Sequence, residues 1–174
     1  GIEIATNISL RVDDVLKGDM EAGEHITVRK PGGAVTVEEY LQSMEDAGIT
    51  YWNAEELKAE YSEEERRENY IQISFCDLDP VIGQKSLYFL EKDAEKELYY
   101  RLCDGFGQYV ETASGEYVNA YEIADEKRNA DEPMMLALGE TVEFDPDAAP
   151  EERINIYTMD EIKEGMETYT APPT

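Results

Sequence analysis

Apolar residues recur at every second position in several short stretches of the chain, and this alternation limits the fold more than any other feature. In residues 8–12, isoleucine, leucine and valine alternate with polar residues, and residues 24–30 repeat the pattern around Ile26 and Val28. A period of two places the apolar side chains on one face of a β-strand. We therefore predict two half-buried strands here, paired antiparallel across a loop rich in glycine and acidic residues.

Further strands are predicted in the second part of the chain, separated by glycine turns. They cover residues 70–76, 86–90, 98–103, 108–111, 117–121 and 154–157. The stretch 86–90 is almost wholly apolar, which is typical of a central strand covered on both faces. Short strands between regular turns indicate a small barrel or sandwich. The predicted fold class is mainly β, an OB-like or netrin-like β-barrel with helical additions, and α+β overall.

The period changes to that of a helix after residue 36. Thr36 and Glu39 form the sequence pattern of a capping box, the following apolar residues lie three and four positions apart, and Gly48 supplies a stop. A second helical stretch starts at Asn53, with Glu56 as its capping partner, and continues through Ser62 to about residue 69 with seven glutamates between positions 55 and 68. We predict a helical insertion over residues 36–69, in which the stretch from Asn53 is an exposed helix packed along one narrow seam.

The C-terminal part combines an irregular segment with one short helix. Residues 129–152 hold eight acidic residues and no Lys or Arg, with an apolar island at 134–138. This composition predicts a long acidic loop held in place by the island. Thr158 and Glu161 repeat the capping-box pattern and predict a helix over residues 158–168.

We expect a single domain spanning residues 1–174, since a chain of this length can bury an ordinary hydrophobic core. Its barrel core covers about 2–35 and 70–157. The helical insertion, the acidic loop and the C-terminal helix decorate this core.

The charge balance excludes some classes of partner. The chain has 41 Asp plus Glu against 15 Lys plus Arg, a formal net charge of -26. A nucleic-acid-binding protein needs a basic stripe, and no more than two basic residues are adjacent anywhere in this sequence. The longest apolar runs are also far shorter than a bilayer crossing requires. We expect no nucleic-acid partner and no direct membrane insertion.

The residues that usually carry catalysis or bind metals are sparse. His25 is the single histidine, and it is expected to be exposed on a strand. No phosphate-binding loop, nucleophile elbow or zinc motif occurs, so we predict no catalytic residue and no cofactor, and an enzyme is the less favoured reading. Two acidic turns give weak candidates for a metal ion: Asp77, Asp79, Asp145 and Asp147. Acidic turns are usually only turns.

Cys76 and Cys103 each end a predicted strand. If the strands at 70–76, 86–91 and 97–103 form a simple meander, the outer two lie about 9.6 Å apart, since neighbouring strands are about 4.8 Å apart. A disulfide requires Cα atoms within about 7 Å. We therefore expect two free, largely buried thiols, whereas another strand order would reverse this expectation.

Tyrosines interleave with polar residues along the later strands. They supply weak candidates for a ligand-binding surface, together with one arginine: Tyr99, Arg101, Tyr109, Tyr117 and Tyr121. Amphipathic rings on a sheet can stack on sugars or peptides, and they also fill cores and rims. The sequence leaves both readings open.

The order of several short motifs resembles a known group of modules. The motifs are VDDVLKG at 12–18, ITV at 26–28 followed by the pair Gly32-Gly33, LYFL at 87–90, YYRL at 99–102 and GFGQY at 105–109. They are similar to small OB-like or netrin-like β-barrel modules in secreted proteins and lipoproteins of Gram-positive bacteria, most of them uncharacterised. The resemblance implies an extracytoplasmic location, secreted or lipid-anchored at the cell surface, and it carries over no catalytic residue. The insertion at 36–69 is longer than such modules lead us to expect.

Four functional hypotheses follow. The leading one is an extracytoplasmic binding module that recognises an unknown protein, peptide or glycan at the cell envelope through its surface, without catalysis. A second is an acidic charge mimic that binds basic partners. A third is a carboxylate-dependent hydrolase, since 41 acidic residues guarantee that some pairs lie within catalytic distance. Protease inhibition, by analogy with netrin-like inhibitors, ranks last because the chain lacks their N-terminal cysteine.

Overall fold

The computed structural model describes residues 4–73, 78–142 and 154–168. The chain divides into two compact units, Gly1–Asn7 with Lys30–Phe75 and Ile8–Arg29 with Cys76–Thr174. Each unit is described by itself below. The sequence analysis expected a single domain, and that expectation stays a prediction next to the two compact units found in the structure.

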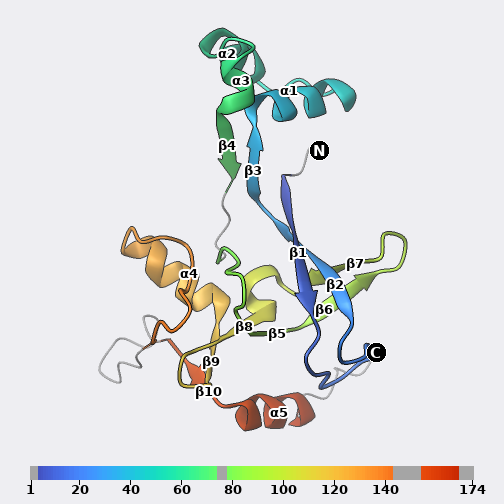
Figure 1. Ribbon diagram of the computed structural model, residues 1–174, viewed down its shortest axis with the longest axis vertical. Helices are drawn as coiled ribbons and strands as arrows, with labels where there is room; N and C mark the ends of the chain where they lie inside the picture. The colour runs from blue at the N-terminus through green and yellow to red at the C-terminus, as the bar shows by residue number, and fades with distance from the viewer. Residues whose placement is uncertain (1–3, 74–77, 143–153, 169–174) are drawn as a thin grey trace. The chain divides into compact units, whose positions relative to one another are not determined.

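The first unit joins a two-stranded ladder to three helices. Strand β3 (Gly33–Thr36) pairs antiparallel with β4 (Tyr70–Ile73). Helices α1 (Val37–Asp46), α2 (Ala54–Glu60) and α3 (Glu65–Glu68) lie between them in sequence and gather at one end of the ladder (Figure 1). Their buried core consists of Val37, Leu41, Met44 and Ala54. The predicted helical insertion at 36–69 is thus present.

Helix α1 begins where its sequence predicts. The backbone N–H of Glu39 donates to the Thr36 hydroxyl at 3.1 Å, and the Thr36 N–H donates to the Glu39 carboxylate at 2.9 Å. This reciprocal capping box satisfies two amide groups that a helix start otherwise leaves without partners. Gly48 follows the helix with φ of 64°, a left-handed conformation that favours glycine.

The following helical stretch is divided. Asn53 precedes α2 without a side-chain cap, so the predicted pairing of Asn53 with Glu56 is wrong. The capping interaction forms instead at Ser62, whose N–H and hydroxyl both donate to Glu65 at 2.8 and 2.7 Å. The chain therefore restarts as the short α3 at this point.

Two four-stranded sheets are built mainly from the second unit. One has the order β1 (Ala5–Arg11), β2 (His25–Pro31), β7 (Leu98–Arg101), β6 (Leu90–Asp93). The other has the order β10 (Ile156–Tyr157), β9 (Tyr117–Asn119), β8 (Gln108–Glu111), β5 (Ser86–Tyr88). The two predicted N-terminal strands are neighbours as expected, and β2 also pairs in parallel with β7.

The strand pairing corrects two expectations. The stretch 86–90 is not one central strand, because β5 pairs with β8 and β6 pairs with β7 in different sheets. The described strands consequently do not form the meander assumed for 70–76, 86–91 and 97–103. The fold is mixed α+β, and the described residues form three separate sheets without a closed ring of paired strands. The predicted barrel is therefore not confirmed.

A helix lies where the sequence predicted the end of a strand. Residues 117–121 were expected to be extended, but β9 ends at Asn119 and α4 (Ala120–Asn129) begins directly after it. The Asn119 side chain accepts from the Tyr121 N–H at 3.0 Å and caps the helix. Helix α4 lies beside β8 and β9 in Figure 1.

The core of the second unit lies between α4 and one face of the second sheet. Val110 and Val118 are directly opposite one another on β8 and β9, and both are fully buried. They pack with Ile123 and Ala124 from α4 and with Leu136. Leu136 belongs to the predicted apolar island, so the island does anchor the part of the acidic loop that the structure describes.

The C-terminal helix agrees with its prediction. Helix α5 (Met159–Thr168) follows β10. The N–H of Thr158 donates to Glu161 at 2.8 Å, as a capping box requires. None of the helices in the described residues has the length and apolar character that a membrane crossing needs.

Candidate functional site

Three tyrosines share one face of the second sheet. Tyr157 lies opposite Tyr117 across β10 and β9, and Tyr117 lies opposite Glu111 across β9 and β8. Tyr109 is two residues before Glu111, so it shares this face as well. Since the opposite face carries the buried Val110 and Val118, the tyrosine face points away from the core around α4.

Three aromatic rings on this face are in contact, those of Phe89, Tyr109 and Tyr157. The Tyr109 and Tyr157 rings meet edge to face with centroids 5.8 Å apart, and Phe89 meets Tyr109 in the same way at 6.1 Å. Edge-to-face contacts are favoured arrangements for aromatic pairs and hold their orientation. All three tyrosines are half-buried. We call Phe89, Tyr109, Tyr117 and Tyr157 the tyrosine face.

Carboxylates adjoin the phenol groups. The Tyr117 hydroxyl donates to Glu111 at 3.4 Å. Burial, followed by the Glu111 charge, raises the pKa of Tyr117. Burial, followed by the charges of Glu122, Tyr109 and Glu161, raises the pKa of Tyr157. Both hydroxyls therefore stay protonated at neutral pH and keep a hydrogen-bond donor.

The structure brings together only two of the five predicted ligand-binding residues. Tyr109 and Tyr117 belong to the tyrosine face. Tyr99 lies on β7 in the other sheet, 5.7 Å beneath the Lys92 amino group. Tyr121 lies on α4, where its ring stacks on Phe106 at 4.2 Å.

Arg101, the fifth candidate, is buried and hydrogen-bonded to another strand. It is 6% exposed and donates to the Gln108 side chain at 3.0 Å. Gln108 in turn donates to the Ser86 hydroxyl at 3.3 Å. This buried guanidinium is thus hydrogen-bonded to a side chain of a neighbouring strand.

Tyr157 belongs to the tyrosine face but was not a candidate in the sequence analysis. The predicted strand at 154–157 contained it, yet no pairing partner could be assigned to that strand from the sequence. Pairing of β10 with β9 sets Tyr157 opposite Tyr117. The alternation in residues 154–157, combined with this register, is the signal that would have found it.

The metal candidates gain no support. Asp77, Asp145 and Asp147 lie outside the described residues. Asp79 is half-buried, and its backbone N–H donates to the Met134 carbonyl oxygen at 2.6 Å. Among residues 4–73, 78–142 and 154–168, no group of three or more His, Cys, Asp or Glu side chains could hold a metal ion.

The cysteine and histidine predictions have different outcomes. Cys103 is exposed and left-handed, with φ of 53°, where a buried thiol was expected. It follows the end of β7 in a turn, and this position explains its exposure. Cys76 lies outside the described residues, so the pairing of the two cysteines stays a prediction. His25 is exposed, as its place in the alternation predicted.

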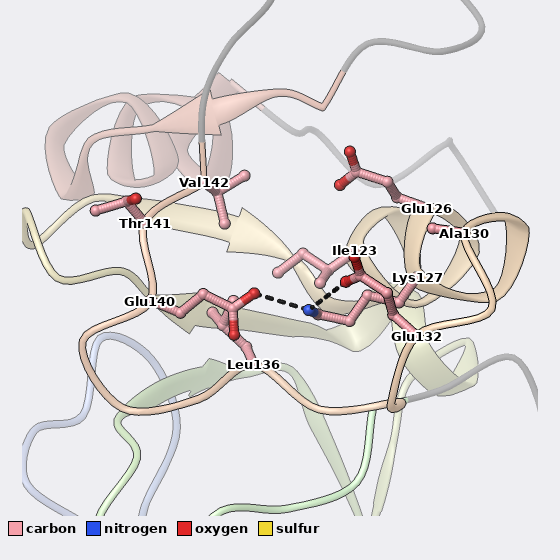
Figure 2. A pocket seen from close by; sticks show the side chains of 9 residues that line it. All are labelled: Ile123, Glu126, Lys127, Ala130, Glu132, Leu136, Glu140, Thr141 and Val142. Atoms are coloured by element: carbon pink, nitrogen blue, oxygen red, sulfur yellow. Dashed lines mark hydrogen bonds and ion pairs between the residues drawn. The ribbon is translucent and has the colours of Figure 1, made fainter.

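A pocket of about 280 Å³ lies between α4 and the loop that follows it. Its apolar part includes Ile123, Leu136 and Val142. Figure 2 shows the Lys127 amino group between the carboxylates of Glu140 and Glu132, at 2.7 and 3.4 Å. These contacts tie the loop to the helix.

The ion pairs shift the pKa values of their partners in opposite directions. Desolvation alone would lower the pKa of Lys127, but the hydrogen bonds and charges of Glu140 and Glu132 outweigh it and raise this pKa. Burial alone would raise the pKa of Glu140, but Lys127 and the Ala137 N–H lower it. Both charged forms are thus favoured by folding.

Replacing Glu140 with glutamine is expected to lower the free energy of unfolding by about 1 to 2 kcal/mol at pH 7, because it leaves the buried ammonium of Lys127 with a weaker partner. Glu140 is partly exposed, with 35% of its side chain accessible, and solvent screening keeps the effect below that of a fully buried pair. Urea unfolding of both proteins across a pH series measures the difference.

The sign of the pH dependence follows from the two shifts. The lowered pKa of Glu140 contributes stability above its unfolded value near 4.3, and this contribution disappears as pH falls through the folded value. The raised pKa of Lys127 contributes below about 10.4 and is lost at higher pH. The difference in free energy of unfolding between the parent protein and E140Q should therefore be largest between about pH 5 and 10.

The exposed pair of Glu45 and Lys58 is the matched control, and E45Q should change stability by less than about 0.5 kcal/mol. Equal effects of E140Q and E45Q would contradict the assignment.

The described carboxyls with resolved shifts do not resemble a general acid. The pKa is lowered for Glu39, Glu65 and Glu161 by hydrogen bonds from capping residues, and for Glu140 by its partners. A carboxyl that donates a proton at neutral pH needs a raised pKa. These four groups therefore serve helix starts and the loop anchor.

Comparison with protein-family models, curated proteins and solved structures finds no match.

Proposed function

We propose that this protein is a binding module that recognises its ligand through the tyrosine face and does not transform it. The observation that carries the proposal is the alignment of Tyr109, Tyr117 and Tyr157 on one sheet face, with the rings of Tyr109 and Tyr157 in contact. Tyrosines combine an apolar ring with a polar tip, and they are enriched where proteins bind ligands.

A glycan is the ligand class that fits this chemistry best. Aromatic ring faces accept the apolar faces of sugar rings, while sugar hydroxyls donate to carboxylates and accept from phenols. Glu111 lies within hydrogen-bond distance of Tyr117, so both kinds of group are present side by side. A location at the cell envelope, outside the cytoplasm, and an OB-like barrel topology belong to this proposal and rest on the sequence resemblance.

Binding of neutral oligosaccharides, including peptidoglycan fragments, to the full chain tests the proposal. We expect saturable binding in a glycan array and in calorimetry, and we expect Tyr157→Ala to reduce the affinity about tenfold or more. Tyr99→Ala is the matched control, because Tyr99 lies on the other sheet and should leave affinity unchanged. Circular dichroism confirms that both variants fold.

Three outcomes would contradict the proposal. They are the absence of any saturable glycan binder, equal losses in the Tyr157 and Tyr99 variants, and turnover of a bound glycan that a single carboxylate substitution abolishes. A peptide ligand that depends on Tyr157 would replace the glycan while keeping the site.

The acidic charge mimic remains a second candidate, favoured by the net charge of -26. In the first unit, residues 30–73 contain 11 acidic and 4 basic residues, a difference of -7. Binding of a basic partner to the first unit should weaken steeply between 50 and 200 mM salt as screening shortens the Debye length from about 14 to about 7 Å. Binding that is independent of salt would remove this candidate.

A further inference from the structure

Glu111 belongs to a row of polar side chains that crosses the tyrosine face. Strand pairing sets Glu111 opposite Tyr117, and Tyr117 opposite Tyr157. On the other side, the Glu111 N–H donates at 3.0 Å to the carbonyl oxygen of Lys85, the residue before β5. The row of Lys85, Glu111, Tyr117 and Tyr157 therefore runs across the sheet from β5 to β10.

The Glu111 carboxylate has unused capacity to accept hydrogen bonds. An ionised carboxylate offers about four acceptor positions on its two oxygens. Among the residues that the structure describes, the Tyr117 hydroxyl, at 3.4 Å, is the one group that donates to this carboxylate. The Glu111 side chain is 27% accessible, so water reaches it only in part. A partly desolvated carboxylate with open acceptor positions is stabilised by a ligand that brings further donors.

Lys85 does not fill these acceptor positions. Its amino group lies 3.9 Å from Oε2 of Glu111, which is beyond hydrogen-bond distance. The lysine side chain is 68% accessible, and exposed ion pairs of this kind contribute little to stability. Oε2 of Glu111 is therefore open to a ligand, and the Lys85 amino group can donate to the same ligand beside it.

Aromatic rings lie beside this polar row. Tyr109 precedes Glu111 by two residues on β8, so both side chains are on the same face of the sheet. The Tyr109 ring contacts the Tyr157 ring, which belongs to the row itself. A sugar ring stacked on these tyrosines carries its hydroxyl groups at its edge. Two hydroxyls on adjacent carbon atoms can donate side by side to the two oxygens of one carboxylate, as other bidentate donors do.

We propose that Glu111 determines the specificity of the tyrosine face, and that the ligand is a glycan with two free hydroxyl groups on adjacent carbon atoms. One hydroxyl donates to Oε2 of Glu111 and the other to the open position on Oε1, while the apolar face of the sugar lies on the aromatic rings. This inference rests on the proposed glycan-binding function and names the class of glycan. No bond is made or broken.

The experiment measures binding of gluco-, manno- and galacto-oligosaccharides to the full chain by calorimetry, together with deoxy forms that lack one hydroxyl at a time. We expect the parent protein to lose about tenfold or more in affinity when either of two adjacent hydroxyls is missing, because an acceptor position of Glu111 is then left unfilled. Glu111→Ala should bind the complete sugar as weakly as these two deoxy forms. A residue that only held Tyr117 in place would instead lower the affinity for every form by the same factor.

Two further variants separate specificity from other causes. Glu116→Ala removes the same charge from the turn before β9, where the Ser114 hydroxyl donates to Glu116 at 2.8 Å, and it should leave both affinity and the deoxy pattern unchanged. Glu111→Gln keeps the shape of the side chain and replaces one acceptor oxygen by an NH₂ donor. It should therefore remain sensitive to one of the two hydroxyls at most. Circular dichroism confirms that each variant folds.

The inference is overturned if the parent protein binds glycans and no pair of adjacent deoxy positions weakens binding. It is also overturned if Glu111→Ala keeps the deoxy pattern of the parent. In both cases, glycan binding that depends on Tyr157 would leave the proposed function standing. The absence of any glycan binder would remove the proposed function and this inference together.

Discussion

Replacing Ile123 with alanine should lower the free energy of unfolding by about 2 to 5 kcal/mol. Ile123 is 1% exposed on α4 and packs with Val110, Val118 and Leu136 in the core of the second unit. The substitution removes apolar contacts and leaves a cavity that neighbours on a helix and a sheet fill only in part. Urea unfolding followed by circular dichroism measures the loss.

Ile82→Ala is the matched control, because it makes the same chemical change at a side chain that is 97% exposed. It should change stability by less than about 0.5 kcal/mol. If the two substitutions had equal effects, α4 would not pack on the sheet as described. A large loss at Ile82 would also mean that this side chain is covered by something else.

Helices with a complete local signal could be predicted from the sequence. α1 and α5 each begin with a threonine followed three residues later by a glutamate, and in both the hydrogen bonds form as the pattern requires. Such a signal lies within one helical turn and does not need contacts with distant parts of the chain. Where the first residue was Asn53 instead, the cap did not form.

Helix α4 was missed because strand and helix signals overlap at its start. Tyr117 and Val118 alternate as in a strand, and the alternation ends only at Asn119, which acts as the helix cap. The apolar stripe of the helix is narrow, since it rests on Ala120, Ile123 and Ala124, and its last buried member is Lys127. A buried lysine reads as polar in a sequence pattern, although its ion pairs make it part of the packing.

Most strand pairings depend on contacts between distant residues, and the sequence predicted only that β1 and β2 are neighbours. The apolar run 86–90 gave the right secondary structure but the wrong arrangement, because its two halves join different sheets. Half of the tyrosine face was therefore predictable. Tyr109 and Tyr117 were candidates, whereas Tyr157 joined them only through the pairing of β10 with β9.

Three backbone segments approach each other closely at Phe89, where the 86–90 run is divided between two sheets. The Phe89 N–H donates to the Gly107 carbonyl oxygen at 2.8 Å, and the Phe89 carbonyl oxygen accepts from the Leu102 N–H at 2.9 Å. Phe89 thus holds the turn at Gly107 against the chain at Leu102. A Cβ on Gly107 would collide with the Leu102 carbonyl oxygen and lie 2.9 Å from the Leu102 nitrogen.

Gly107→Ala should therefore lower the free energy of unfolding by about 3 kcal/mol or more, because backbone atoms on both sides must move to admit one methyl group. Gly107 is not in the left-handed region, so the cost comes from lack of space and not from its dihedral angles. Gly165→Ala is the control: this glycine lies inside α5 with nothing within 4 Å of the added Cβ. Alanine there should stabilise the helix by up to about 1 kcal/mol.

If Gly107→Ala lowers the free energy of unfolding and Gly165→Ala raises it, general effects on the unfolded chain cannot explain both results, because they favour alanine at both positions. Chemical denaturation of both variants, with the parent protein alongside, gives the comparison. If Gly107→Ala is neutral or stabilising, the approach of Gly107 to Leu102 is wrong. The pairing of Tyr109 on β8 with Leu87 on β5, which depends on the same turn, would then have to be revised together with the tyrosine face.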